Sequence, residues 1–548
     1  MNTKILPKSQ NVYEYPLLIK RILEQSLKYE PNNEIVYRDV MRYNYFDLNS
    51  RVRKLANALR RLGVNAGDTV AVIDFDSHRY LELYFAIPMI GAVLHTINYR
   101  LSPSQALYTI NHAEDKIIFT HTDFLPLIEG IQKEMKTVEK IVAITDYKEL
   151  PETSVDIFGK YEELLANEND EYDFPDFDEN SVATIFYTTG TTGNPKGVYF
   201  SHRQLVLHTL GLMGSLGSYD SACRFRSNDN YMPLTPMFHV HAWGIPYLAT
   251  MLGVKQVYPG RYEPEMLLKL LLSEKITFSH CVPTILHMLV SSPVVKTVDL
   301  TNWKVVIGGA ALPSGLAQKA LELGIDVITG YGLSETCPVL TLSYLNEKDR
   351  SLSIEEQVKI RTKTGIPVPL VELKIVNDEG EALPHDGKSV GEIVVRTPWL
   401  TEGYFKEPEK SDELWKDGYL HTGDVAYVDE KNFVKITDRI KDVIKTGGEW
   451  VSSLELENLI SKHSAVSEVA VVGIPDEVWT ERPHAMIVLK EGETVDKSDI
   501  QEFLQQFVQN GTINKWTVPD SIAFVEAIPK TSVGKIDKKK IRSELLKQ

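Results

Sequence analysis

Alternating helical and strand-like patterns in the N-terminal part of the chain constrain its fold more than any other feature. Across residues 48–62, apolar side chains recur every three or four positions, as on one face of a helix, and Gly63 follows where a helix would end. A short apolar run at 69–73 then indicates a buried strand, and the same order returns repeatedly up to 326–329. Short buried strands that alternate with helices predict a parallel α/β sheet with helical crossovers.

The same patterns predict the individual elements of this alternation. We expect helices near residues 15–27, 80–90, 201–216, 264–273 and 284–291, and a further helix that ends at Leu323. We expect strands near residues 92–97, 116–120, 140–144, 182–187, 254–258, 276–281 and 305–307. Residues 150–180 are acidic and weakly periodic, so we interpret them as a solvated connecting loop.

The pattern changes after Pro338. Residues 364–440 are rich in alternating, half-exposed strands, which predict a small β-barrel. From Lys441 onward the chain is strongly charged, and we expect helices at 454–461 and 497–510 and strands at 468–472, 486–489 and 521–525. The expected fold is therefore α/β: a large N-terminal domain, residues 1–440, of α/β sheets plus the small β-barrel, followed by a small α+β C-terminal domain, residues 441–548.

Composition restricts the class of protein. A chain of 548 residues with 43% hydrophobic and 24% charged residues is ordinary globular material with more than one domain. Its net charge of −16 argues against a nucleic-acid partner, which would require a basic face. The three cysteines, Cys223, Cys281 and Cys337, are far apart and show no C-x-x-C spacing, so we expect neither a disulfide framework nor a zinc site, and a reducing, cytoplasmic setting.

Targeting and membrane signals are not found in the sequence. The first ten residues lack the apolar core of a signal peptide, and the last five carry no peroxisomal tripeptide or prenylation box. The longest stretch without charge, residues 230–254, contains three prolines and two histidines. We therefore expect no membrane span there and interpret the stretch as the wall of a pocket.

A loop rich in glycine and threonine follows the strand expected at 182–187. Residues 187–197 have the sequence YTTGTTGNPKG. Glycine lets backbone N–H groups approach an anion, threonine hydroxyls can bind phosphate oxygens or a hard cation, and Lys196 adds a positive charge, so the loop suits a polyphosphate. The loop is not a Walker A motif, because Pro195 and Gly197 replace the second glycine and the hydroxyl residue. Taken alone, it is equally typical of a polar turn.

Two further glycine-rich segments follow expected strands. Residues 308–313 follow the strand at 305–307, and residues 330–336, with the sequence GYGLSET, follow the strand at 326–329. The carboxyl ends of parallel strands meet at one edge of a sheet, where ligands bind in α/β folds. We therefore expect both segments to border the same crevice.

Four motifs together resemble the adenylate-forming superfamily of acyl-CoA synthetases, peptide-synthetase adenylation domains and luciferases. They are residues 187–197, 330–336, 419–424 with 438–441, and 529–535, and they occur in the order and spacing of that superfamily over nearly the whole chain. The chain is most similar to medium- and long-chain fatty-acyl-CoA synthetases and to 4-hydroxybutyrate-CoA ligases. The resemblance implies that the enzyme activates a carboxylic acid with ATP to acyl-AMP and pyrophosphate, and then transfers the acyl group to coenzyme A.

The resemblance also implies which residues bind ATP and magnesium. Thr191 and Glu335 correspond to Mg²⁺ ligands, Asp424 to the residue that binds the ribose hydroxyls, and Tyr331 to the aromatic face for adenine. The nucleotide site implied by the family comprises Thr188, Thr189, Gly190, Thr191, Thr192, Gly193, Asn194, Pro195, Lys196, Gly309, Ala310, Thr329, Gly330, Tyr331, Gly332, Leu333, Ser334, Asp424, Arg439 and Lys441. The family more often has serine where Thr189 stands, and threonine retains that hydroxyl.

The C-terminal motifs carry the remaining catalytic roles of the family. Lys535 corresponds to the lysine that stabilises charge during adenylation, and Lys441 to a hinge about which the small domain moves between the two half-reactions. Residues Gly447, Gly448, Glu449 and Trp450 resemble the stretch that meets the pantetheine arm of coenzyme A. The chain ends soon after the Lys535 motif, without room for a carrier domain, so we expect free coenzyme A as the acceptor.

The acid pocket implied by the resemblance is formed by His239, Trp243, Gly308 and Cys337. His239 corresponds to a histidine with a positional role in catalysis, and Trp243 to a tryptophan that gates the acyl tunnel in some bacterial members. A zinc site from His239 and His241 is an alternative, although a third ligand is not evident. Acetyl-type members carry a bulky tryptophan near Cys337, and its absence favours an acid longer than acetate.

Several alternatives remain open at this level. The acid could be a short hydroxy acid such as 4-hydroxybutyrate instead of a medium-chain fatty acid. The acceptor could be a separate carrier protein. The chain could also be a nucleotide- or acyl-binding regulator without catalysis, although it retains Lys535, Glu335 and Asp424. Fatty-acyl relatives often form dimers, so we expect a homodimer by analogy alone.

Overall fold

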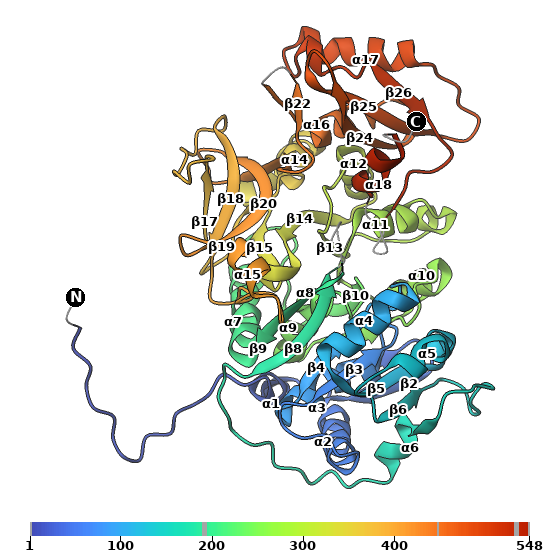
Figure 1. The fold of residues 1–548 in the computed structure, drawn as a ribbon, viewed down its shortest axis with the longest axis vertical. Coiled ribbons are helices and arrows are strands. Elements are labelled where there is room, and N and C mark those ends of the chain that lie inside the picture. The colour runs from blue at the N-terminus through green and yellow to red at the C-terminus, as the bar shows by residue number, and fades with distance from the viewer. Residues whose placement is uncertain (1–2, 189–193, 447–448, 531–535, 546–548) are drawn as a thin grey trace.

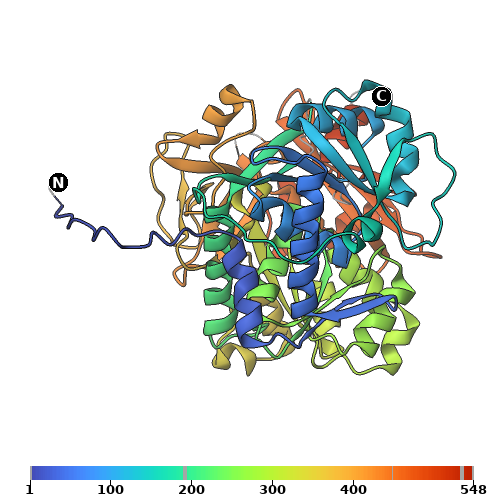
Figure 2. The ribbon, with the colours of Figure 1, turned by 90° about the horizontal axis from the view of Figure 1, so that it is seen from below.

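The computed structural model of the protein describes residues 3–188, 194–446, 449–530 and 536–545, which form four β-sheets covered by helices (Figure 1). The two larger sheets occupy the lower part of Figure 1, a smaller sheet (β17, β18, β19, β20) lies at their side, and a fourth sheet (β22, β24, β25, β26) forms the top. The described residues up to Tyr15 are exposed and lead away from the body of the molecule (Figure 2), whereas Leu18 and Ile19, just before the first helix, are buried. The large N-terminal and small C-terminal domains expected from the sequence are thereby confirmed.

The first large sheet has seven strands in the order β7-β6-β5-β3-β4-β8-β9. Its strands are parallel except β9, which runs antiparallel to β8. The bounds are β3 (Thr69–Ile73), β4 (Val93–Thr96), β5 (Asp115–His121), β6 (Lys140–Ile144), β7 (Ile157–Lys160), β8 (Val182–Thr188) and β9 (Lys196–Ser201). The apolar runs predicted as buried strands therefore form the parallel sheet that the alternation implied.

The second large sheet has nine strands in the order β16-β15-β14-β13-β12-β10-β11-β1-β2. Its centre, from β14 to β1, is parallel, and β2, β15 and β16 are antiparallel additions at the two edges. The bounds are β1 (Glu34–Tyr37), β2 (Met41–Asn44), β10 (Asn230–Leu234), β11 (Lys255–Tyr258), β12 (Phe278–Cys281), β13 (Lys304–Ile307), β14 (Asp326–Gly332), β15 (Val339–Leu342) and β16 (Ile366–Pro367).

Helices cover both large sheets, and one of them lies between the two. The helix α3 (His78–Met89) is buried along its whole length and contacts β1 of one sheet and β3 and β4 of the other. It combines apolar and aromatic side chains with two buried charged residues, and each of these is paired: Arg79 with Glu162, and Glu82 with Arg51. The other helices of this part are α1 (Lys20–Tyr29), α2 (Tyr45–Arg61), α4 (Pro103–Ala113), α5 (Leu125–Ile131), α6 (Tyr161–Ala166), α7 (His202–Met213), α9 (Ile245–Leu252), α10 (Pro264–Ser273), α11 (Pro283–Val290), α12 (Ser314–Glu322), α13 (Glu347–Arg350) and α14 (Ile354–Arg361).

The two smaller sheets follow in the C-terminal third of the chain. One is antiparallel and consists of β17 (Glu372–Val376), β18 (Val390–Arg396), β19 (Trp415–Lys416), β20 (Tyr419–Val428) and β21 (Val434–Arg439), with α15 (Pro408–Leu414) before β19. The other consists of β22 (Ile444–Thr446), β23 (Glu449–Val451), β24 (Val466–Asp476), β25 (Thr480–Leu489) and β26 (Ser521–Phe524), with α16 (Ser453–Ile460), α17 (Lys497–Gln509) and α18 (Lys538–Leu545). Strand pairing among the described residues leaves the first sheet open, so the predicted barrel is an open sheet.

Three local expectations differ from the structure. Residues 150–180 are not a continuous loop, because β7 and α6 interrupt them. Glu162 of α6 forms ion pairs with Arg51 and Arg79, so part of the acidic charge serves packing and not solvation. The predicted helix begins at His202 and does not follow the polyphosphate motif directly, because most of β9 lies between them, and β9 pairs antiparallel with β8.

The uncharged stretch at 230–254 forms β10, a left-handed turn and α9. No helix of the described ranges is long and apolar enough to cross a membrane. Most of its side chains are buried, and its role as the wall of a pocket stays a prediction.

A buried carboxylate joins the two large sheets. Asp76 follows β3, is 3% exposed, and accepts hydrogen bonds from the Met237 amide at 2.8 Å and the Tyr262 hydroxyl at 2.6 Å. Its own carbonyl oxygen accepts from the Gly260 amide at 2.8 Å. All three partners belong to segments that follow β10 or β11 of the other sheet. Burial raises the pKa of Asp76 to about 7.

A second constraint lies where β14 and β15 turn back on each other. Gly332 pairs with Val339, and a Cβ atom placed on Gly332 would lie 1.6 Å from the carbonyl oxygen of Pro338. The second glycine of GYGLSET is therefore required by backbone packing, independently of any ligand.

Replacing Asp76 should change how stability depends on pH. The pKa of Asp76 is about 7 in the folded state and about 3.9 in the unfolded state. The folded state therefore binds the proton of this carboxyl more tightly. As pH rises from about 4 to 7, loss of the proton lowers the free energy of unfolding. Asparagine does not titrate, so Asp76→Asn should gain about 2–3 kcal/mol relative to wild type between pH 5 and pH 8. Urea denaturation across this range measures the difference, and exposed Asp378→Asn is the control. Parallel pH profiles for Asp76→Asn and wild type would contradict it.

The Gly332→Ala substitution should destabilise the fold by about 3 kcal/mol or more, because a backbone atom occupies the space of the new methyl group. The matched control is Gly315→Ala in α12, where a Cβ atom meets no atom within 4 Å. Alanine in a helix is favoured over glycine by about 0.5–1 kcal/mol, so the control should be neutral or stabilised. Thermal melting of both variants tests the pair, and equal melting temperatures would show that the strands at Gly332 can separate.

Candidate active site

A tyrosine that the sequence did not single out links two of the predicted motifs. The ammonium of Lys196 lies 4.3 Å from the ring centroid of Tyr404, whose hydroxyl donates a hydrogen bond to the carboxylate of Glu335 at 2.8 Å. Burial and the neighbouring carboxylate raise the pKa of Tyr404, so its hydroxyl stays protonated and donates. The phosphate-loop lysine and the predicted magnesium ligand therefore lie against the same side chain.

Backbone hydrogen bonds hold the segment of Tyr404 against both motifs. The Thr401 amide donates to the carbonyl oxygen of Glu335 at 2.9 Å, and the Phe405 amide donates to the carbonyl oxygen of Gly197 at 2.8 Å. The segment 401–405 thus bridges the start of β9 and the end of GYGLSET. No charge pattern or spacing in the sequence marks this segment, which explains why sequence reasoning missed Tyr404.

The predicted ribose site is formed by a hydrogen-bonded group on β14, β20 and β21. Both oxygens of the Asp424 carboxylate accept hydrogen bonds, one from the Tyr331 hydroxyl at 2.7 Å and the other from the Arg439 guanidinium at 3.0 Å. A carboxylate offers about four acceptor positions, so further donors such as sugar hydroxyls can still bind. Burial raises the pKa of Tyr331, which keeps its hydroxyl a donor.

The remaining predicted ATP-site residues lie at strand ends, in or after β14, or outside the described residues. Thr188 ends β8, Asn194 and Pro195 precede β9, and Gly309 and Ala310 are exposed after β13. Gly330, Leu333 and Ser334 are half-buried in or after β14, whereas the Thr329 hydroxyl is engaged with the carbonyl oxygen of Arg361 at 2.8 Å. Outside the described residues lie Thr189, Gly190, Thr191, Thr192, Gly193, Gly447, Gly448 and Lys535, together with the side chains of Glu449 and Trp450.

The predicted hinge lies beside a buried contact between β21 and α16. The Asp438 carboxylate accepts from the amide and the hydroxyl of Ser453, both at 2.6 Å, and Lys441 is exposed two residues after Arg439. Lys538 of α18 donates a hydrogen bond to the same hydroxyl at 2.5 Å. These contacts attach the start of the C-terminal sheet to the last strand before the hinge.

Three of the four predicted acid-pocket residues lie together. A Cβ atom on Gly308 would lie 2.9 Å from the Trp243 indole, and one on Gly244 would lie 3.8 Å from the Cys337 carbonyl oxygen. Trp243 is part of a left-handed turn, α8 (Val240–Trp243), in which four successive residues other than glycine have φ between 47° and 58°. Such a turn costs about 1–2 kcal/mol per residue, and strained backbone of this kind concentrates at functional sites.

The two histidines of this stretch have different surroundings. His239 is half-buried before the turn, whereas His241 is fully buried among the rings of Tyr84, Phe186, Phe200 and Tyr247. Burial lowers the pKa of His241 to about 3. Within the described ranges, no group of three histidine, cysteine, aspartate or glutamate side chains could hold a metal ion, so the geometry does not support the zinc alternative.

Glu335 fits a role in binding magnesium together with a nucleotide. Mg²⁺ in phosphate sites is bound by one or two carboxylates plus phosphate oxygens, and does not require a full cage of protein ligands. Glu335 is a single, half-buried carboxylate close to Lys196, which matches that ligand set.

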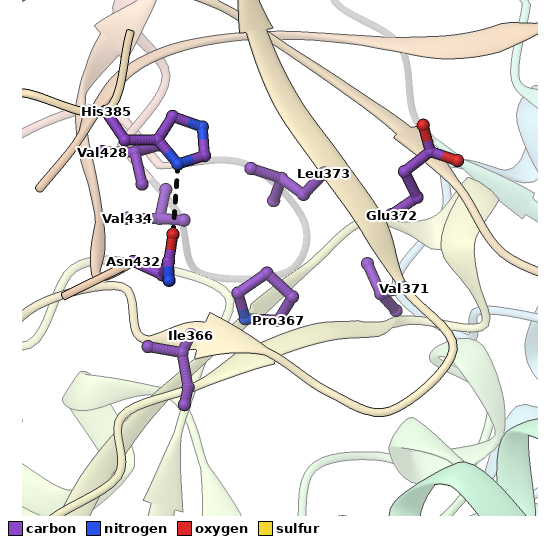
Figure 3. Close-up of a pocket in the computed structure, with 9 residues that line it drawn as sticks. All are labelled: Ile366, Pro367, Val371, Glu372, Leu373, His385, Val428, Asn432 and Val434. Carbon is purple, nitrogen blue, oxygen red and sulfur yellow. Dashed lines mark hydrogen bonds between the residues drawn. The ribbon is translucent and has the colours of Figure 1, made fainter. Parts of the chain in front are cut away.

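A pocket of about 390 Å³ lies elsewhere, between the open five-stranded sheet and β16 (Figure 3). It is lined by Ile366, Pro367, Val371, Glu372, Leu373, His385, Val428, Asn432 and Val434. No residue of the predicted site is among these nine, and the carboxylate of Glu372 points away from the others (Figure 3). The pocket is therefore separate from the site described above.

Comparison with known proteins identifies the family to which the chain belongs. The model of the family described as AMP-binding enzyme matches residues 23–405, and that described as AMP-binding enzyme C-terminal domain matches residues 455–535. The chain is 41% identical to a long-chain-fatty-acid–CoA ligase of Thermus thermophilus over 95% of its own length and 94% of the relative's. It is 39% identical to a 3-methylmercaptopropionyl-CoA ligase of Ruegeria pomeroyi, with 98% of each chain covered.

Solved structures agree with the same relationship. An anthranilate CoA ligase in complex with anthranoyl-AMP superposes with a TM-score of 0.83 at 25% identity, covering 97% of this chain and 98% of the other. Both parts of the chain are therefore matched in sequence and in fold. The chain belongs to the family of AMP-binding enzymes.

Proposed function

We propose that the protein activates a carboxylic acid with ATP to an acyl-adenylate and pyrophosphate, and then transfers the acyl group to coenzyme A with release of AMP. The observation that carries this function is the contact of Tyr404 with both Lys196 and Glu335, close to the Tyr331–Asp424–Arg439 group. The Lys196 ammonium suits a polyphosphate, the Glu335 carboxylate suits a magnesium ion, and the Asp424 carboxylate suits the hydroxyls of a sugar. Together they suit a magnesium-bound nucleotide. The names of the two ligases reported above support the reaction type.

The described residues divide the work of adenylation. Lys196 attracts the polyphosphate, Asp424 accepts hydrogen bonds from the ribose, and Glu335 would hold Mg²⁺ with Thr191. When bound, Mg²⁺ neutralises charge on the phosphate oxygens. The acid carboxylate attacks the α-phosphorus, the bond to the bridging oxygen breaks, and pyrophosphate leaves. Positive charge on Lys196 and Lys535 stabilises the negative charge that develops on the phosphate oxygens. Such stabilisation typically contributes a factor of about 10²–10³ to the rate.

The thioester step involves the C-terminal part of the chain. We assign residues 1–440 to ATP and acid binding and 441–548 to a domain that moves about Lys441 and brings residues 447–450 to coenzyme A. The thiol then loses its proton to solvent and attacks the acyl carbonyl carbon. The bond from this carbon to the bridging oxygen breaks, and AMP leaves with that oxygen. Lys441 is exposed, as suits a hinge residue, and rotation there would break the Asp438–Ser453 contact, which joins the two sides of the hinge.

The acid is proposed to be a medium-chain fatty acid or a related acid. The indole of Trp243 lies over Gly308 and limits the length of the pocket in this conformation. Cys337 leaves more room than the tryptophan of acetyl-type members would. The His239 side chain, half-buried at the start of the same turn, is assigned a positional role toward the carboxylate.

Pyrophosphate exchange tests the proposed function. Radiolabelled pyrophosphate should enter ATP only when an acid is present, with an optimum among straight-chain acids from C2 to C16 and hydroxy acids, and thioester should form on addition of coenzyme A. Exchange without thioester would indicate a carrier protein as acceptor. ATP binding without exchange for any acid would contradict an enzymatic role.

The Lys535→Ala variant should separate the two half-reactions. Loss of this positive charge should slow adenylation about 10²–10³-fold, because the charge is needed where phosphate charge develops. The thioester step, started from synthetic acyl-adenylate and coenzyme A, should retain most of its rate. Exposed Lys388→Ala, on a turn of the small sheet, serves as the control for loss of one lysine. Equal losses in both half-reactions would contradict the assigned role of Lys535.

A further inference from the structure

The indole of Trp243 also contacts a buried histidine of the central sheet. Its ring centroid lies 4.9 Å from that of His280 on β12, in addition to its contact with Gly308 at the end of β13. His280 is 0% exposed. The indole of Trp243 therefore contacts both Gly308, a residue of the predicted acid pocket, and His280, so a group that took the place of the indole would lie against this histidine.

Only one nitrogen of the His280 ring has a partner. Nε2 is hydrogen-bonded to the Tyr231 hydroxyl at 2.8 Å, and Tyr231 lies on the adjacent strand β10. Nδ1 is buried and has no hydrogen-bond partner among the described residues. A buried polar atom without a partner is uncommon in folded proteins, because it has lost its hydration without a replacement.

The surroundings of His280 define the kind of group that would complete it. Burial lowers the pKa of His280 to about 3, so the ring is neutral at working pH and offers one donor and one acceptor nitrogen. The rings of Tyr231 and Trp243 lie against His280, and the apolar residue Val306 is paired with it on β13. A charged group would be poorly solvated there. A hydroxyl suits either tautomer, because it can both donate and accept.

We propose that His280 is a specificity-determining residue that binds an uncharged polar group, such as a hydroxyl, carried on the acyl chain of the acid beyond Trp243. This inference rests on the proposed function and narrows its substrate class to acids with an apolar body and a hydrogen-bonding group at one defined distance from the carboxylate. Trp243 moves from its contact with Gly308, and the polar group then meets Nδ1 of His280.

Matched acids test this inference without knowledge of the natural substrate. Each pair replaces a terminal methyl group by a hydroxyl at the same length: pentanoate with 4-hydroxybutyrate, hexanoate with 5-hydroxypentanoate, and heptanoate with 6-hydroxyhexanoate. The measured quantity is the hydroxyl-to-methyl ratio of kcat/KM in pyrophosphate exchange. Because both acids are assayed on the same preparation, the ratio does not depend on the fraction of folded enzyme.

In the wild type, the ratio should be higher at one chain length than at the others. His280→Phe should lower that maximum about tenfold, since the hydroxyl then lacks a partner. His280→Asn should keep part of the maximum, because an amide can donate and accept, and His280→Leu replaces the Phe variant if that one does not fold. The matched control is His202→Phe, which removes another buried histidine with one unpartnered nitrogen, packed against Phe177 and outside the site.

Two results would overturn the inference. One is active exchange with a ratio that is the same in wild type and His280→Phe at every length, and this would leave the proposed function intact. The other is an equal fall of the ratio in His202→Phe, which would show that the effect arises from general loss of packing. Absence of exchange with any acid in the wild type would overturn the proposed function together with the inference.

Discussion

The candidate site depends on the position of Tyr404 between a cation and an anion. The Lys196 ammonium lies over its ring face, and its hydroxyl donates a hydrogen bond to the Glu335 carboxylate. The two charged groups are thereby held near each other through Tyr404 and not by a direct ion pair. A cation–π contact contributes about 0.5–2 kcal/mol, and a hydrogen bond to a charged group about 1.5–3 kcal/mol. Both charged groups therefore remain available to a ligand, whereas a salt bridge between them would leave each group less able to bind one.

The two large sheets supply the rigid frame that this arrangement needs. The helix α3 fills the space between them, and Asp76 connects the loop after β3 with the segments after β10 and β11. Met237, which Asp76 holds, lies two residues before His239 and three before the left-handed turn. Buried hydrogen bonds from Tyr84 and Thr96 fix the carbonyl oxygens of Met237 and Phe238. The segment of the proposed acid pocket is thus attached to the sheet that carries the predicted phosphate loop.

Strain and incomplete hydrogen bonding coincide beside the proposed acid pocket. The turn that carries Trp243 has a backbone conformation that L-residues rarely adopt, and His280 behind it has one unpartnered ring nitrogen. Core packing around the turn offsets these unfavourable terms in the structure described. A ligand group that met Nδ1 of His280 would remove the second of these terms.

Local sequence determined the secondary structure and the family of this chain. Apolar periodicity predicted strands such as Thr69–Ile73 and Lys140–Ile144, because burial on both faces requires continuous apolar runs. Motifs rich in glycine and threonine predicted the nucleotide loops, because the residue types that suit a phosphate group also follow one another along the chain. Only the tertiary structure decided which side chains meet: Tyr404 with Lys196 and Glu335, Tyr331 with Asp424, and Trp243 with His280. These partners are distant in sequence, and their contacts follow from strand order and register, which no local pattern encodes.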